Sequence, residues 1–88
     1  MKNRDRAEIN AMILDIASHG RVTKTKIMYR AYLSYNKLEE YLTDLEESEL
    51  LEYEVGAHAY RTTEKGKRYL EIHSKMNELI SINREVAV

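Results

Sequence analysis

Two helix starts lie close together in residues 23–48, TKTKIMYRAYLSYNKLEEYLTDLEES. Thr23 and Ser34 each precede a helical pattern, and the hydroxyl of such an N-cap residue accepts a hydrogen bond from a backbone N–H of the first turn. The helix after Ser34 is expected to run to about Ser48, because leucines recur at spacings of four and three residues and form a narrow apolar stripe. The stripe consists of Leu38, Leu42 and Leu45. The stretch therefore predicts two short helices joined by a tight turn.

An amphipathic helix is expected before this pair, from about Arg4 to Ser18. Its apolar residues recur at helical spacing, and charged residues occupy the opposite face. They are Ile9, Met12, Ile13 and Ile16. Gly20 follows the helix and suits a left-handed C-terminal cap.

A two-stranded hairpin is expected after the pair. Residues 51–55, LEYEV, alternate apolar and acidic side chains with the period of a half-buried strand. Gly56 and Ala57 fit a two-residue turn, and residues 58–62 would return as the second strand. Three helices followed by such a hairpin form the element order of a winged helix.

A long helix is expected to follow the hairpin, capped by Thr63. Gly66 so close to its start should weaken it by about 1 kcal/mol relative to Ala. Apolar residues then recur at alternating spacings of three and four, which predicts a coiled-coil seam for dimerisation. The seam consists of Tyr69, Ile72, Met76, Leu79, Asn83 and Val86. It could instead fold back on its own domain, but the polar Asn83 favours association, since a polar seam residue can fix register and partner number.

These elements predict a mainly α fold of the α+β type, with three helices, a two-stranded wing and a long C-terminal helix. We divide the 88 residues into a winged-helix domain, 1–66, and a C-terminal helix, 67–88, for homodimerisation.

Charge is distributed unevenly along a chain whose formal net charge is only −1. Residues 21–37 contain basic side chains and no acid, residues 39–54 contain acids and no base, and residues 61–68 are again mainly basic. Such a bipolar molecule could approach a polyanion with its basic side.

Several classes of function have no support in the sequence. The absence of Cys excludes disulfides, thiolate zinc sites and a cysteine nucleophile. The histidines His19, His58 and His73 have no ligand spacing, so we expect no metal site. Catalytic triads, phosphate-binding loops and dinucleotide fingerprints are missing, and so are a secretory signal and an apolar stretch long enough for a membrane. We expect a cytoplasmic protein that is not an enzyme and has no cofactor or small-molecule substrate.

The expected function is binding of double-stranded DNA. The second of the paired helices would enter the major groove with its first turn while flanking cations neutralise phosphates. The candidate DNA-binding residues are Lys24, Lys26, Arg30, Ser34, Tyr35, Asn36, Lys37, Tyr41, Arg61 and Lys65. Glu40 would face the same groove or be a plain surface acid. Most of the seven tyrosines are expected in the core or at its rim. With about four to six phosphates neutralised, log affinity should fall against log salt with a slope near −4 to −5.

Two stretches resemble a known family. Residues 23–35, TKTKIMYRAYLSY, and residues 60–66, YRTTEKG, together with Leu50 and Leu51, look like the small archaeal winged-helix DNA-binding proteins of about ten kilodaltons. The resemblance covers roughly residues 4–79. It implies a dimer joined by an antiparallel coiled coil of C-terminal helices that acts in transcription regulation or chromatin organisation. An alternative remains open, because the acidic helix and first strand could bind a basic protein partner, and fold alone does not decide function.

Overall fold

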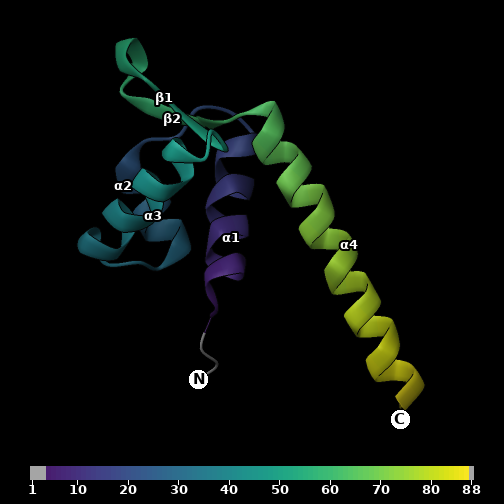
Figure 1. Ribbon diagram of the computed structural model, residues 1–88. Helices are drawn as coiled ribbons and strands as arrows, with labels where there is room; N and C mark the ends of the chain where they lie inside the picture. Colours follow the sequence, from purple (N-terminus) through teal and green to yellow (C-terminus); the bar gives the residue numbers. More distant parts are fainter. Residues whose placement is uncertain (1–3, 88) are drawn as a thin grey trace.

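The computed structural model describes residues 4–87, and it describes side chains as far as residue 80. Its element order confirms the predicted fold: helices, a two-stranded antiparallel sheet and a long final helix (Figure 1). The elements are α1 (Arg6–Ser18), α2 (Lys24–Ala31), α3 (Tyr35–Glu47), β1 (Leu51–Glu54), the 3-10 turn η1 (Val55–Ala57), β2 (Ala59–Thr62) and α4 (Glu64–Ala87).

Side-chain caps explain where the helices begin. The Thr23 hydroxyl accepts from the backbone N–H of Lys26 at 3.2 Å, and Ser34 does the same for Lys37 at 3.2 Å. Thr63 accepts from Gly66 at 3.0 Å at the start of α4. All three predicted caps are therefore confirmed. The first helix begins slightly later than predicted, because Asp5 forms a capping box with Glu8.

The core lies where α1, α2 and α3 meet the sheet. The fully buried side chains come from all three helices, and the predicted stripe of α3 belongs to them. The largest are Ile13, Leu14, Ile27, Leu38, Leu42 and Leu45. Each such side chain contributes about 1.5–3 kcal/mol when removed from water. This core holds α2 and α3 together and so sets the geometry of the turn between them.

The hairpin forms the wing, but its turn differs from the prediction. Leu51 pairs with Thr62 and Glu54 with Ala59, so residues 55–58 connect the strands in place of a two-residue turn. Residues Val55–Ala57 form a 3-10 turn, and His58 takes the left-handed conformation with φ 51°. Gly56 is not left-handed. The prediction of a two-residue Gly-X turn was wrong, because the connection has four residues and the left-handed residue is His58, not Gly56.

The base of the wing is attached to the helical core through polar contacts. The Thr62 hydroxyl donates to the Leu14 carbonyl at 2.6 Å, and Val22 and Tyr60 exchange backbone hydrogen bonds of 3.0 and 2.7 Å. Gly66 lies in the same corner. A Cβ there would stand 2.3 Å from the Leu50 carbonyl oxygen and 2.6 Å from a Thr62 methyl. Gly66 is therefore required by packing, and its interpretation as a weakness of the helix is corrected.

Helix α4 starts beside β2 and projects past α1, away from α2 and α3 (Figure 1). The helix is continuous across residues 66–67, where we divided the chain into a winged-helix domain and a C-terminal helix. Its first part lies on the core, where the Tyr69 hydroxyl donates to the Ala7 carbonyl at 3.4 Å. Further along, an apolar stripe is exposed. It consists of Ile72, Met76, Leu79 and Ile80. The side chains of Asn83 and Val86 lie outside the described residues. None of the helices in residues 4–87 combines the length and the apolar composition that spanning a bilayer requires.

Candidate nucleic-acid interface

The turn between α2 and α3 is short and tightly hydrogen-bonded. Tyr32 adopts the left-handed conformation, φ 55°, and its backbone N–H donates to the Tyr29 carbonyl at 3.4 Å. The next N–H, of Leu33, donates to the Met28 carbonyl at 3.2 Å. Arg4 reaches across from the N-terminus and donates to the carbonyls of Ala31 and Tyr32. These hydrogen bonds satisfy backbone carbonyls at the C-terminus of α2, and three residues separate α2 from α3.

Two cations on α2 are available for an outside anion. Lys26 and Arg30 are exposed and lie one helical turn apart, whereas the residues that follow them, Ile27 and Ala31, are buried. Neither has an acidic partner among the described residues. Arg68 and Lys75 are also without one, but they lie on α4, which Figure 1 shows on the other side of α1. Arg4 and Lys65 also lack an acidic partner among these residues, but their side chains donate to backbone carbonyls. The cations beside α3 whose side chains are not engaged are therefore Lys26 and Arg30.

Lys24 joins α2 to α3 and is not free. Its ammonium donates to the Glu39 carboxylate and lies 5.4 Å from the centre of the Tyr35 ring. The hydrogen bond to Glu39 raises the pKa of Lys24, and the same bond lowers the pKa of Glu39. Lys37 is more loosely engaged, with its Nζ 3.9 Å from Glu40 in the same helix.

The first turn of α3 is exposed, as predicted for Tyr35, Asn36 and Lys37. Ser34 is exposed too, and its hydroxyl is used as the helix cap. Beyond that turn the exposed face becomes acidic. Glu40, Asp44 and Glu47 recur there at the spacing of one helix face. Only the N-terminal end of α3 therefore presents a surface that is compatible with a polyanion.

Tyr41 does not belong to this surface. Its side chain is only 6% exposed and forms part of the core, with the Arg6 guanidinium 4.8 Å from the ring centre. The prediction that it faces a groove is corrected, because Tyr41 lies beside Leu38 and Leu42 on the buried side of α3.

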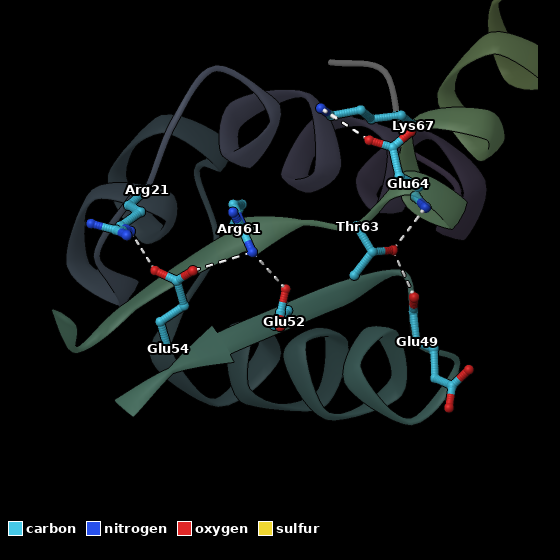
Figure 2. A network of polar contacts seen from close by, with 9 residues as sticks. Arg21, Glu49, Glu52, Glu54, Arg61, Thr63, Glu64 and Lys67 are labelled. Carbon is cyan, nitrogen blue, oxygen red and sulfur yellow. Dashed lines mark hydrogen bonds and ion pairs between the residues drawn. The ribbon is translucent and has the colours of Figure 1, made fainter. Parts of the chain in front are cut away.

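The wing contains basic residues, but they are neutralised within the wing. Arg61 lies opposite Glu52 in the strand register and contacts Glu52 at 3.2 Å and Glu54 at 3.3 Å (Figure 2). Arg21 contacts the other oxygen of Glu54 as an ion pair without an aligned hydrogen bond. Lys65, also a candidate, donates to the Ser48 carbonyl at 2.8 Å. Arg61 and Lys65 therefore differ from Lys26 and Arg30 of α2, because their side chains are already engaged within the protein.

Sequence reasoning missed two residues of this surface. The Tyr29 and Tyr32 side chains are 70% and 83% exposed, although most tyrosines were expected in the core or at its rim. For Tyr29 the helical pattern held a signal, because it shares the exposed face of α2 with Lys26 and Arg30. For Tyr32 no comparable signal existed, since its exposure follows from the left-handed turn.

The fold of this chain is similar to that of other solved structures. Among solved structures, Sso10a-2, a DNA-binding protein from Sulfolobus solfataricus, is similar with a TM-score of 0.73 and 26% identity, over 96% of this chain and 94% of that one. A ZitR mutant from Lactococcus lactis has a similar fold, with a TM-score of 0.68 and 20% identity, over 98% of this chain and 64% of that one. No curated protein matches. The family described as winged helix-turn-helix matches residues 3–81, and the chain belongs to that family.

Proposed function

We propose that the protein binds double-stranded DNA, with α2 over the phosphate backbone and the first turn of α3 at the major groove. One observation carries the proposal: Lys26 and Arg30 are exposed and have no acidic partner among the described residues, and Asn36 and Lys37 are exposed in the first turn of α3. Cations of this kind position a protein on phosphates, while Asn and Lys can bond adenine and guanine edges.

Electrostatics determine how α3 would approach the groove. The helix N-terminus carries a partial positive charge and favours anions, whereas Glu46 and Glu47 near its other end have no cationic partner among the described residues and would repel phosphates. The helix would therefore enter with its N-terminal end and keep its acidic half away from the groove walls. Such docking is shallower than a helix lying along the groove.

Family membership and the likeness to Sso10a-2 support a role in DNA binding. Within that role we propose a non-enzymatic transcriptional regulator or DNA-organising protein of the cytoplasm, as the resemblance to small archaeal winged-helix proteins implies. The two roles differ in sequence preference. A regulator should bind one operator much more tightly than mixed-sequence DNA, since specific binding typically exceeds non-specific binding by at least about a thousandfold.

Fluorescence anisotropy with a mixed-sequence duplex at several salt concentrations tests DNA binding. Because Arg61 and Lys24 are engaged within the protein, about three phosphates per domain should be neutralised, giving a slope near −3. This is less steep than the slope expected from the sequence. Binding that is undetectable at low salt, or independent of salt, would contradict the proposal.

We also propose that α4 joins two copies of the chain. Ile72, Met76 and Leu79 of the predicted seam are between 54% and 64% exposed, which is unusual for large apolar side chains on one helix face. Ile80 adds to this face, whereas Tyr69 packs on its own domain. Sedimentation should give a dimer, and replacing Met76 and Leu79 with Glu should give a folded monomer. A monomeric parent protein would contradict this proposal.

A protein-interaction role is the second candidate, and the acidic face of α3 favours it. Glu46, Glu47 and Glu49 are exposed and have no cationic partner among the described residues, so they present a surface that is suited to a basic partner. Replacing Glu46, Glu47 and Glu49 with Lys should abolish binding of such a partner. The same change should leave binding intact or strengthen it if DNA is the partner.

A further inference from the structure

The Tyr29 and Tyr32 rings are the most exposed tyrosine rings on the described surface, at 70% and 83%. Tyr29 lies in the last turn of α2 and Tyr32 is its C-cap, so both belong to the turn that precedes α3. Neither ring is paired with another aromatic ring or a cation among the described residues. Tyr35, the first residue of α3, has one side occupied by Lys24.

The backbone at Tyr32 adds a second observation. Its φ of 55° lies in the left-handed region, which glycine adopts freely and which crowds the Cβ of other residues. The ring does not compensate through burial. This conformation closes the C-terminus of α2 through backbone hydrogen bonds, and it leaves the Tyr32 side chain exposed at the turn.

We propose that Tyr29 and Tyr32 stack on unpaired nucleic-acid bases, so that the protein prefers DNA with a single-stranded segment over fully paired DNA. Proteins that hold single strands combine aromatic side chains, on which bases stack, with cations for the backbone. Here Lys26 and Arg30 supply unpaired positive charge on the same short helix as Tyr29. The proposal rests on the DNA binding proposed above and adds a preference within it.

The turn suits an anionic partner, because residues 20–38 contain no acid. Among anionic partners, a nucleic acid also offers flat bases on which the two tyrosine rings can stack. An intact duplex would satisfy the cations but leave the rings unused, because its bases are already stacked on one another. A strand with unpaired bases satisfies both groups.

The test compares two DNAs that differ only in pairing: a fully paired duplex, and the same duplex with a central gap that exposes five thymidines. Affinities are measured by anisotropy at one salt concentration. We expect the parent protein to bind the gapped DNA about tenfold more tightly, since one stacked base commonly contributes that much. Equal affinity for the two DNAs would overturn the proposal.

Two variants identify the groups responsible. Tyr29→Ala combined with Tyr32→Gly should reduce the preference to about onefold, because the rings on which unpaired bases would stack are gone. Tyr32→Phe should keep the preference, because the ring remains. If Tyr32→Phe instead weakens binding to both DNAs equally, the tyrosine acts through its hydroxyl on phosphates and the stacking proposal is wrong.

A matched variant serves as a control for effects on folding. Tyr32→Gly removes a left-handed tyrosine, so its melting temperature should rise, and His58→Gly should raise it similarly at the wing, where φ is 51°. His58→Gly should keep the preference for gapped DNA, and its loss there would overturn the proposal. Replacing Lys26 and Arg30 with Gln tests the proposed DNA binding separately, because it should weaken binding to both DNAs. If it weakens neither, the proposed DNA binding fails whatever the tyrosine variants do.

Discussion

The turn between α2 and α3 and the wing both contain basic residues, but only the turn offers them to a partner. Lys26 and Arg30 have no acidic partner among the described residues, whereas Arg61 contacts both Glu52 and Glu54, and Arg21 contacts Glu54 (Figure 2). A count of charges along the sequence treats the two regions alike. Available charge depends on which residues the fold places opposite one another.

Strand register creates this difference. Glu52 and Arg61 are paired across the hairpin, and Glu54 lies two residues along the same strand, so all three side chains share one face of the sheet. On α2, Glu39 of the next helix is paired with Lys24, and no acid of the described residues pairs with Lys26 or Arg30. The wing is therefore expected to contribute little to phosphate binding, whereas the sequence analysis predicted Arg61 as a DNA-binding residue.

The largest expected effect comes from Gly66→Ala, which disturbs the wing and leaves the turn intact. Helix propensity alone predicts a gain of about 1 kcal/mol. The added Cβ would meet a backbone carbonyl at 2.3 Å, so we expect a net loss of about 2–4 kcal/mol in the free energy of unfolding. Urea denaturation measures it, and a stabilised protein would show that the contact between Gly66 and Leu50 is absent in solution.

Neutralising cations in each region tests the comparison directly. Replacing Lys26 and Arg30 with Gln should weaken duplex binding by about tenfold or more and reduce the salt slope by about two. Replacing Arg21 and Arg61 with Gln changes net charge equally, but it should weaken binding by less than about threefold, because these cations are already paired. Equal losses in anisotropy titrations would contradict the difference between the regions.

Removing the acids of the wing should sharpen the same contrast. With Glu52 and Glu54 replaced by Gln, Arg61 and Arg21 lose their partners and become available to phosphates. Duplex affinity should rise by about threefold and the salt slope should steepen by up to about two. Exchanging Glu64 for Gln, an acid at the start of α4 whose partner is Lys67, serves as a control. An unchanged slope would contradict the expectation that these ion pairs keep Arg61 and Arg21 from phosphates.

The smallest expected effect concerns the pair formed by Lys24 and Glu39. Glu39 has a lowered pKa when folded, so its contribution to stability is present above the ordinary carboxyl pKa and is lost as pH falls through the lowered value. Lys24→Met should therefore melt at a lower temperature than the parent protein near neutral pH. The difference should disappear in acid, and a difference that grows as pH falls would contradict the assignment.

Local sequence signals predicted the elements well but not their contacts. Caps at Thr23, Ser34 and Thr63 depend on residues three positions apart, and such spacing is visible in a sequence. The role of Gly66 depends on Leu50 and Thr62 meeting it, and a one-dimensional pattern cannot show that approach.

The candidate site was predictable only in part for the same reason. The exposure of Lys26, Arg30 and Asn36 followed from helical periodicity. The exposure of Tyr32 follows from a left-handed turn that no sequence pattern indicated. The pairing of Arg61 and the burial of Tyr41 could have been inferred, because the predicted turn at residues 56–57 already places residue 52 opposite residue 61, and Tyr41 lies three residues after Leu38 of the predicted stripe.

The most direct test is to follow backbone amides by NMR while a mixed-sequence duplex is added at low salt. If DNA is bound by the helical turn and not by the wing, amides of residues 24–37 should shift, and those of residues 52–61 should stay nearly unchanged. The largest shifts confined to the wing, or none at the turn, would contradict the account.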